Sequence, residues 1–224
     1  MVARTVVFDL DGTLIETAPD LHAVLAGLLV ERGLAAPPLE AVRAMVGDGA
    51  RALLRRAHDW QGIGLGEAEL DALYADFLER YTAEPARLSE VYAGVPAALA
   101  SLRGRGVRLG VCTNKPQRPS ELLLAAVGLE PLLDVVVGGD VLPVRKPDPG
   151  HLRATLEALG ATPGEAVMVG DSGNDLAVAH ALGVPCVLVS FGYTAVPARE
   201  LGADRVIDHF EELLPALEAV AGLP

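Results

Sequence analysis

The 224-residue sequence is poor in cysteine, lysine, aromatic residues and long apolar runs. Its two cysteines, Cys112 and Cys186, lie in strand-like runs and are too few for a disulfide framework, so we expect two reduced thiols in the core. No apolar run approaches the roughly 18 residues that a membrane span needs. The N-terminal segment reaches Asp9 before it forms the apolar region of a signal peptide. These absences argue against a disulfide-stapled or membrane-spanning protein and predict a cytoplasmic location.

Positive charge is also scarce. The net charge of −12 argues against nucleic acid or an anionic membrane surface as a partner. Of the 18 basic residues only Lys115 and Lys146 are lysines, and each precedes a proline shortly after a strand-like run. Because arginine serves wherever a generic positive charge is needed, these two lysines are candidates for sites that require a compact ammonium group.

Alternating strands and helices predict the fold class. Five short runs rich in valine and leucine are typical of strands buried on both faces: Thr5–Phe8, Arg108–Cys112, Val135–Val137, Ala166–Val169 and Cys186–Val189. Helical patterns that end near glycine separate the later runs. The sequence therefore predicts an α/β protein with a doubly wound, Rossmann-like parallel sheet, in which ligands bind beyond the carboxyl ends of the strands.

The segment from Ala18 to Thr82 interrupts this alternation. It contains no convincing strand, and helical patterns cover Pro19–Arg32, Leu39–His58 with a glycine break, and Glu67–Tyr81. We expect a small all-helical cap domain at residues 17–83, inserted into an α/β core made of residues 1–16 and 84–224. A length of 224 residues suits one large domain with a smaller insertion.

Carboxylates follow the first and fourth predicted strands. Asp9 and Asp11 lie two residues apart before Gly12, and Asp171 and Asp175 follow the fourth strand. Four carboxylates at one sheet edge repel one another unless a cation is present. Since no histidine or cysteine joins them, the oxygen-only set favours Mg²⁺.

The second and third strands lead to groups that suit a phosphate. Thr113 and Asn114 offer a hydroxyl, an amide and backbone N–H groups, and Lys146 offers an ammonium group at the same edge. A nucleophile, a hydroxyl, a cation and metal ligands, supplied by successive loops, make up a site for phosphoryl transfer.

These motifs resemble those of the haloacid dehalogenase-like superfamily, in the class with a helical cap after the first motif. The four matching segments span nearly the whole chain: Asp9–Thr13, Thr113–Asn114, Lys146–Pro147 and Gly170–Asp175. The resemblance implies a Mg²⁺-dependent phosphomonoester hydrolase with a doubly wound core and a mobile lid. The expected partner is a small anionic phosphate ester, and both a monomer and a homodimer remain open.

The resemblance also implies a role for each motif residue. Asp9 would be the nucleophile that forms an aspartyl-phosphate, and Asp11 the general acid and then the general base. Lys146 would order the nucleophile and balance its charge. The implied phosphate ligands are Thr113, Asn114 and Lys146, and the implied metal site comprises Asp9, Asp11 through its backbone carbonyl, Asp171, and Asp175 as a supporting residue.

Departures from the superfamily pattern narrow the activity. Asp11 argues against a dehalogenase, and a cap without lysine argues against phosphonate cleavage, whereas phosphatases and mutases of other small sugar phosphates remain possible. A receiver-like phospho-switch is the non-enzyme alternative, which the cap and Asp11 disfavour. The segments Asp11–Asp20, Val46–Ala50 and Thr113–Pro116 resemble phosphoglycolate phosphatases, which act on 2-phosphoglycolate.

The glycine-rich break in the cap is a candidate contact for the substrate carboxylate. Gly47 and Gly49 interrupt a helical pattern, and the helix that restarts after them exposes N–H groups that suit an anion. Arg51 lies in the first turn of that helix and adds a positive charge. Asp48 would repel a carboxylate unless its side chain turns away.

Overall fold

The computed structural model describes residues 2–223, and its centre is a parallel sheet. The six strands follow the order β5-β4-β1-β6-β7-β8, with every neighbouring pair parallel. The strands are β1 (Thr5–Phe8), β4 (Arg108–Cys112), β5 (Val135–Val137), β6 (Ala166–Gly170), β7 (Cys186–Val189) and β8 (Arg205–Ile207). This confirms the predicted α/β fold, and the sequence analysis missed only the short edge strand β8 of this sheet.

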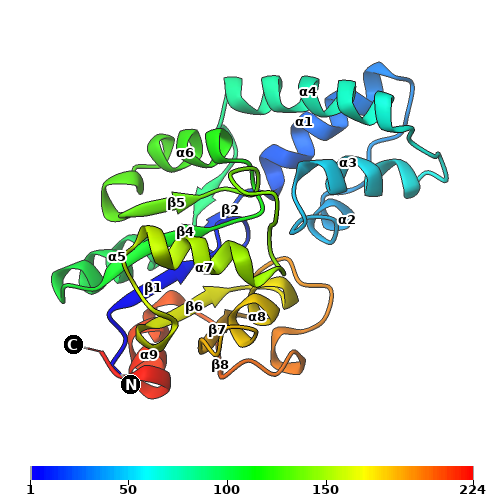
Figure 1. Ribbon diagram of the computed structural model, residues 1–224. Coiled ribbons are helices and arrows are strands. Elements are labelled where there is room, and N and C mark those ends of the chain that lie inside the picture. Colours follow the sequence, from blue (N-terminus) through cyan, green and yellow to red (C-terminus); the bar gives the residue numbers. More distant parts are fainter. Residues whose placement is uncertain (1, 224) are drawn as a thin grey trace.

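Helices cover both faces of the sheet, as Figure 1 shows. Side chains of alternate residues in β1 point to opposite faces. Val6 and Phe8 pack with one set of helices and Val7 with the other. The first set is α5 (Val95–Gly104), α6 (Gln117–Ala126) and α9 (Leu213–Ala221), and the second is α7 (Pro149–Ala158) and α8 (Gly173–His180). Short 3₁₀ turns complete the connections: η1 (Glu130–Leu132), η2 (Pro163–Glu165), η3 (Ala198–Glu200) and η4 (Phe210–Glu212).

Four further helices form a separate layer beyond the sheet, seen in blue and cyan in Figure 1. They are α1 (Ala18–Glu31), α2 (Leu39–Arg43), α3 (Ala50–Asp59) and α4 (Glu67–Ala83). These helices bury an apolar cluster of their own, which includes Leu25, Leu54 and Phe77. We call residues 17–83 the cap. Within residues 2–223 no helix is both long enough and apolar enough to cross a membrane.

Two connections join the cap to the core, and they are bound to each other. β2 (Ile15–Glu16) and β3 (Glu90–Val91) pair in antiparallel fashion. Next to them, the buried carboxylate of Asp20 accepts hydrogen bonds from the backbone N–H groups of Leu88 and Ser89, at 2.8 to 3.0 Å. These contacts lie close to residues 17 and 83, where we propose the boundaries of the cap domain.

The strand order places a crevice next to the cap. From β1 the chain proceeds to β4 on one side of the sheet, and from β6 to β7 on the other side. β1 and β6 are neighbours, so the winding direction reverses between them. Ligands of doubly wound sheets bind at such a reversal, beyond the carboxyl ends of the strands.

Candidate active site

Three buried carboxylates meet at this reversal point. Asp9 directly follows β1, Asp171 directly follows β6, and Asp175 lies in the first turn of α8. An oxygen atom from each side chain lies within 4.8 Å of an oxygen of the other two. All three residues are at most 7% exposed. The fold therefore brings together the aspartates of the first and fourth motifs and concentrates negative charge there.

Lys146 lies among these carboxylates. It follows β5 in sequence, and its Nζ lies 2.8 Å from Asp9 Oδ1 and 2.7 Å from Asp175 Oδ1. Burial opposes the charged form of this ammonium, but attraction to Asp175 and Asp9 outweighs burial and raises the pKa of Lys146. The lysine is therefore a fixed positive charge beside the candidate nucleophile.

One ammonium does not neutralise the cluster. Burial raises the pKa of Asp9 to about 6, with Lys146 opposing the shift and the charge of Asp175 adding to it. Burial, together with the charges of Asp175 and Asp9, raises the pKa of Asp171 well above its usual range. A buried set of carboxylate oxygens with excess negative charge fits a hard divalent cation. These residues are thus suited to hold a metal ion.

Asp175 already uses both of its oxygens within the protein. Oδ1 accepts from Lys146, and Oδ2 accepts from the backbone N–H groups of Asp171 and Ser172 and from the Ser172 hydroxyl, at 2.8 to 3.2 Å. Ser172 and Asp175 form a capping box that starts α8. Asp175 therefore orders the loop that carries Asp171. This role suits a residue that positions a metal ligand without binding the metal directly.

Tyr193 connects this cluster to the cap. Its backbone N–H donates to Asp171 Oδ2 at 2.6 Å, and its hydroxyl accepts from the N–H groups of Thr17 and Ala18 at 2.7 and 2.9 Å. Gly12 packs against both Asp171 and Tyr193, because a Cβ at this position would lie 2.6 and 2.8 Å from their side chains. With φ at +82°, the turn after the first motif requires glycine.

Asp11 lies apart from the three-carboxylate cluster and pairs with the second lysine. Lys115 Nζ lies 3.1 Å from Asp11 Oδ1 and 3.4 Å from Oδ2. The same ammonium lies 4.3 Å from the ring centroid of Tyr81, near the end of cap helix α4. Burial opposes the charge of Lys115, but Asp11 and Tyr81 outweigh it and raise the pKa of the lysine. Lys115 therefore contacts both the first motif and the cap.

Thr113 and Asn114 follow β4 and differ in their partners. Thr113 Oγ1 accepts a hydrogen bond from the backbone N–H of Lys115 at 3.2 Å, which leaves its own hydrogen for another acceptor. Asn114 Nδ2 donates to the carbonyl oxygens of Gly47 and Lys146 at 2.9 and 3.0 Å. Because both amide hydrogens are engaged, the side chain of Asn114 links the cap to the core and has no hydrogen left to donate to a phosphate.

The glycine-rich cap loop rests against this segment. Gly47 and Gly49 have φ values of +121° and +85°, and a Cβ on Gly49 would lie 2.9 Å from the carbonyl oxygen of Asn114. Asp48 turns away from the pocket, where it pairs with Arg56 and accepts from Asn174 Nδ2 at 2.8 Å. Its repulsion of a bound carboxylate is thereby reduced.

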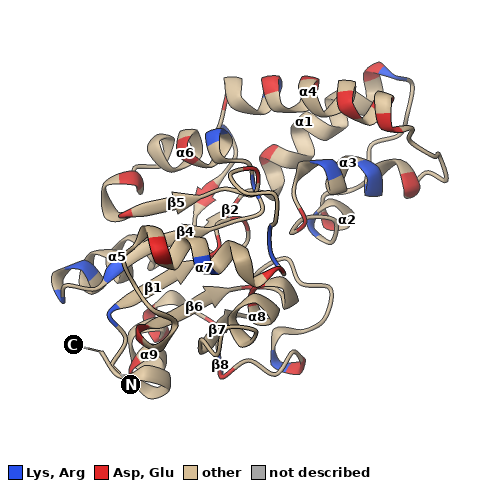
Figure 2. Ribbon diagram, viewed as in Figure 1, with Lys and Arg blue, Asp and Glu red and all other residues tan. Residues whose placement is uncertain are grey.

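Arg51 lies outside the pocket. Its guanidinium donates to Asp71 Oδ1 at 2.6 Å and lies 3.5 Å from Glu67 Oε2, both on α4. The blue segments on α3 in Figure 2 belong to this surface network of arginines and acids. The structure thus brings Gly47 and Gly49 to the pocket wall and leaves Arg51 at the surface.

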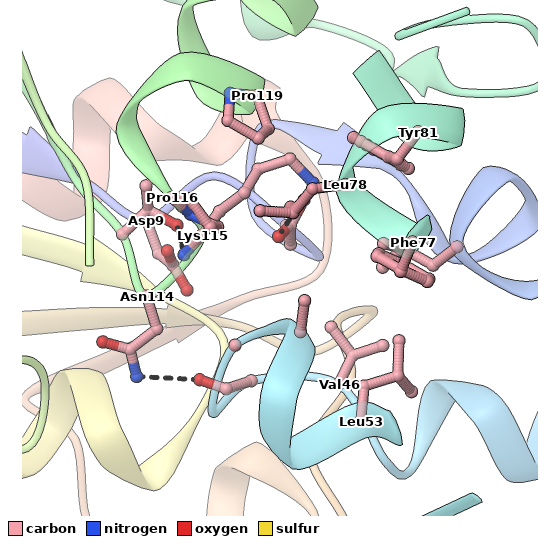
Figure 3. Close-up of a pocket in the computed structure, with 16 residues that line it drawn as sticks. Asp9, Val46, Leu53, Phe77, Leu78, Tyr81, Asn114, Lys115, Pro116 and Pro119 are labelled. Atoms are coloured by element: carbon pink, nitrogen blue, oxygen red, sulfur yellow. Dashed lines mark hydrogen bonds and ion pairs between the residues drawn. The ribbon is translucent and has the colours of Figure 1, made fainter. Parts of the chain in front are cut away.

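A small pocket lies between core and cap (Figure 3). Its polar floor contains Asp9, Asp11, Thr113 and Lys115, and its walls are apolar side chains such as Val46, Leu53, Phe77 and Leu78. The cavity volume is about 30 Å³. This is room for about two water molecules, so the cap is closed down over the candidate nucleophile.

Comparison with known proteins gives the family. The sequence model of the haloacid dehalogenase-like hydrolase family matches residues 3–183. The chain belongs to this family. A phosphoglycolate phosphatase from Rhodospirillum rubrum is 46% identical, covering 94% of this chain and 89% of the relative.

Solved structures agree with this hydrolase fold. The crystal structure of a predicted phosphoglycolate phosphatase from Haemophilus somnus superposes with a TM-score of 0.90 at 31% identity, covering 95% of this chain and 97% of that one. CbbY from Rhodobacter sphaeroides, crystallised in complex with phosphate, gives a TM-score of 0.83 at 26% identity, covering 97% and 100% of the two chains.

Three residues of this haloacid dehalogenase-like hydrolase were not singled out from the sequence. Tyr81 and Tyr193 contact Lys115 and Asp171, respectively, and Asn174 binds the cap loop. Asn174 lies inside the fourth motif, which was a usable signal. The two tyrosines lie 34 and 22 residues from their partners in sequence, and no local pattern marks them.

Proposed function

We propose that this chain hydrolyses 2-phosphoglycolate to glycolate and phosphate through an aspartyl-phosphate on Asp9. One observation carries the chemistry: Asp9 and Asp11 line the same small pocket, and each is paired with its own buried lysine. Membership of the hydrolase family and high identity to named phosphoglycolate phosphatases support the substrate.

The first half-reaction uses Asp9 as the nucleophile. Lys146 and the backbone N–H of Leu10 both bind Asp9 Oδ1, the latter at 2.7 Å, which fixes the carboxylate at the pocket floor. The other carboxylate oxygen would form a bond to phosphorus as the bond to the glycolate oxygen breaks. Asp11 would donate its proton to that leaving oxygen.

The second half-reaction reverses the role of Asp11. The carboxylate would take a proton from a water molecule as the water oxygen attacks phosphorus, which breaks the bond to Asp9 and releases inorganic phosphate. Thr113 would donate its free hydroxyl hydrogen to the phosphoryl group. One acid–base residue thus serves both steps, and the enzyme returns to its starting state.

The proposal includes Mg²⁺. Asp9, Asp171 and the backbone carbonyl of Asp11 would hold the ion, with Asp175 as the supporting residue. Bound Mg²⁺ supplies positive charge that offsets the carboxylates and the phosphoryl oxygens. A cytoplasmic location, a role in carbohydrate metabolism and the core and cap boundaries given above also belong to the proposal.

The pocket between core and cap is narrow. A cavity of about 30 Å³ between Lys115 and the apolar cap wall holds about two water molecules, so the cap must shift outward to admit any phosphate ester. A two-carbon acid requires a smaller shift of the cap than a hexose does. The narrow pocket therefore favours phosphoglycolate over larger sugar phosphates.

A panel of small phosphate esters, ranked by kcat/KM, tests the proposal. We expect 2-phosphoglycolate to rank first, above glycerol phosphate and hexose phosphates. A preference for a hexose phosphate would keep the phosphatase and discard the phosphoglycolate assignment. Steady turnover of a generic aryl phosphate would exclude a receiver-like switch, whose phosphoaspartate persists.

A further inference from the structure

Lys115 is buried in the floor of the pocket, although it lies outside the four motifs of the family. It is 5% exposed, and among the described residues that line the pocket it is the only cation. Lys146, by contrast, is held beneath the floor by Asp9 and Asp175. Any second anionic group on a substrate would therefore meet Lys115 as its nearest pocket-lining cation.

The walls around Lys115 make such a partner necessary. Val46, Leu53, Phe77 and Leu78 offer no hydrogen-bond donor from their side chains. A carboxylate buried among apolar groups without a partner is strongly disfavoured. A substrate with a carboxylate thus requires a donor on the pocket surface.

The three arginines of cap helix α3 are already paired with acids. Arg51 pairs with Asp71, Arg55 pairs with Glu67, and Arg56 pairs with Asp48. None of these three arginines lines the pocket. These arginines are therefore not available to a substrate carboxylate, which must bind to a residue that lines the pocket.

Tyr81 adds a second donor beside Lys115. The tyrosine is 2% exposed and lines the same pocket. Its hydroxyl lies beside the Lys115 ammonium, which can only donate, so within residues 2–223 the hydroxyl hydrogen has no acceptor. Burial raises the pKa of Tyr81, so its hydrogen stays in place. A buried hydroxyl without an acceptor is costly unless a ligand completes it.

We propose that Lys115 and the hydroxyl of Tyr81 together bind the carboxylate of the substrate, an inference that rests on the phosphoglycolate phosphatase activity proposed above. An ammonium group has three hydrogens. Lys115 can keep Asp11 as one partner and donate to the substrate with another. Lys115 thereby couples recognition of the substrate to the position of the acid–base residue, and Tyr81 makes that recognition depend on the cap.

The test compares two esters that differ in one group. 2-Phosphoglycolate and 2-hydroxyethyl phosphate have similar size, but only the first carries a carboxylate. The ratio of their kcat/KM values isolates the carboxylate contact, because any damage through Asp11 affects both esters. The variants are Lys115→Met, which keeps the length without the charge, and Tyr81→Phe, which removes only the hydroxyl. Arg55→Ala is the control for loss of an exposed cap cation.

We expect the wild-type ratio to favour 2-phosphoglycolate, and Lys115→Met to reduce that ratio by about 100-fold, as expected for a buried charged contact. Tyr81→Phe should reduce the ratio by roughly 5- to 10-fold, and Arg55→Ala should leave it unchanged. In an Asp9→Asn background, calorimetry should show the same weakening of 2-phosphoglycolate binding by Lys115→Met.

Equal losses on both esters with Lys115→Met would overturn the inference, because Lys115 would then act through Asp11 alone. If Arg51→Ala abolished the preference for 2-phosphoglycolate while Lys115→Met and Tyr81→Phe kept it, the carboxylate would bind at the cap surface instead. If Lys115→Met fails to fold, an unchanged ratio in Tyr81→Phe still contradicts the paired site. A wild-type enzyme with no preference for 2-phosphoglycolate would instead refute the proposed substrate.

Discussion

The core side of the pocket, its floor, is charged, whereas the cap side, its roof, is apolar. In the floor, charged side chains hold one another through short contacts, such as Lys146 with Asp9 and Asp175 at 2.7 to 2.8 Å. The roof consists of apolar cap side chains, and its loop is tied to the core by contacts such as that of Asn114 with Gly47. The floor is therefore preorganised for chemistry on any phosphomonoester, whereas we expect the roof to open and to close best over a suitable substrate.

The largest expected effect comes from the centre of the floor. Asp9→Asn should lower kcat by more than about 10⁴-fold on every ester, since an amide does not attack phosphorus. Lys146 keeps Asp175 as a partner, so we expect the variant to fold, and circular dichroism checks this. Retention of more than about a hundredth of kcat would rule out the covalent route.

Metal removal tests the same floor without a mutation. A chelator should abolish activity on both a small ester and an aryl phosphate, and added Mg²⁺ should restore it. The raised pKa values of Asp9 and Asp171 show that burial and crowding disfavour their charged forms, which a divalent cation would stabilise. Ca²⁺ should inhibit, since it accepts more oxygen ligands in a looser geometry. Asp171→Asn should raise the Mg²⁺ concentration needed for half-maximal activity. Full activity in excess chelator contradicts the metal site.

Lys146 should matter for stability as well as for rate. Lys146→Met leaves Asp9 and Asp175 without their shared cation, a loss of about 3 to 5 kcal/mol in the free energy of unfolding. kcat should fall by orders of magnitude on all esters. Lys146→Arg should restore little, because a planar guanidinium does not fit between the two carboxylates. Chemical denaturation and kinetics measure both effects, and normal kinetics in Lys146→Arg would show that any cation suffices.

The sequence predicted the fold because its strands carry a strong local signal. Runs such as Val135–Val137 are short, apolar and bounded by helical patterns, and the glycine breaks mark helix ends. β8 has only three residues, one of them Arg205, and the connecting strands β2 and β3 have two each. Such short strands contain too few residues to show a period, so tertiary pairing defines them.

The candidate site was predictable where a motif is contiguous and less so where partners are distant. Asp9 and Asp171 could be placed together because both end parallel strands. The pairing of Lys115 with Asp11 joins residues 104 apart. Arg51 looked suited to an anion from its place in a helix, but its partner Asp71 lies on another helix, 20 residues further along the chain. Side-chain direction across elements is not encoded in local spacing.

Closing the roof depends on a glycine. Gly49→Ala forces a side chain into a left-handed conformation and places its Cβ 2.9 Å from the carbonyl of Asn114. We expect kcat/KM for 2-phosphoglycolate to fall by about 10- to 100-fold, since the strained φ disfavours the loop conformation and the close contact is relieved only when the loop lies further from the core. An aryl phosphate, which needs no cap contact, should be less affected. Gly64→Ala is the control, because a Cβ there meets nothing within 4 Å; equal losses in both variants would contradict the role of the close approach.

The smallest effect is expected at the outer edge of the roof. Asn174 Nδ2 donates to Asp48 Oδ1 at 2.8 Å, a partly buried bond between the core and the cap loop. This contact exists only when the cap is closed, so Asn174→Ala destabilises the closed state and increases the population of the open state. Asp48 keeps its ion pair with Arg56, so the loss is limited to this bond and to a longer contact of Asn174 Nδ2 with the Gly47 carbonyl at 3.5 Å. We expect kcat/KM for 2-phosphoglycolate to fall roughly 2- to 10-fold, with activity on an aryl phosphate nearly unchanged. Asp48→Ala and the double variant complete a mutant cycle. Asp48→Ala also removes the ion pair with Arg56, but the two effects should be less than additive because both variants remove the bond between Asn174 and Asp48. A loss above about 100-fold on both substrates would instead mean that Asn174 orders the floor through its neighbour Asp175. The division between a preorganised floor and a movable roof would then not hold at this edge.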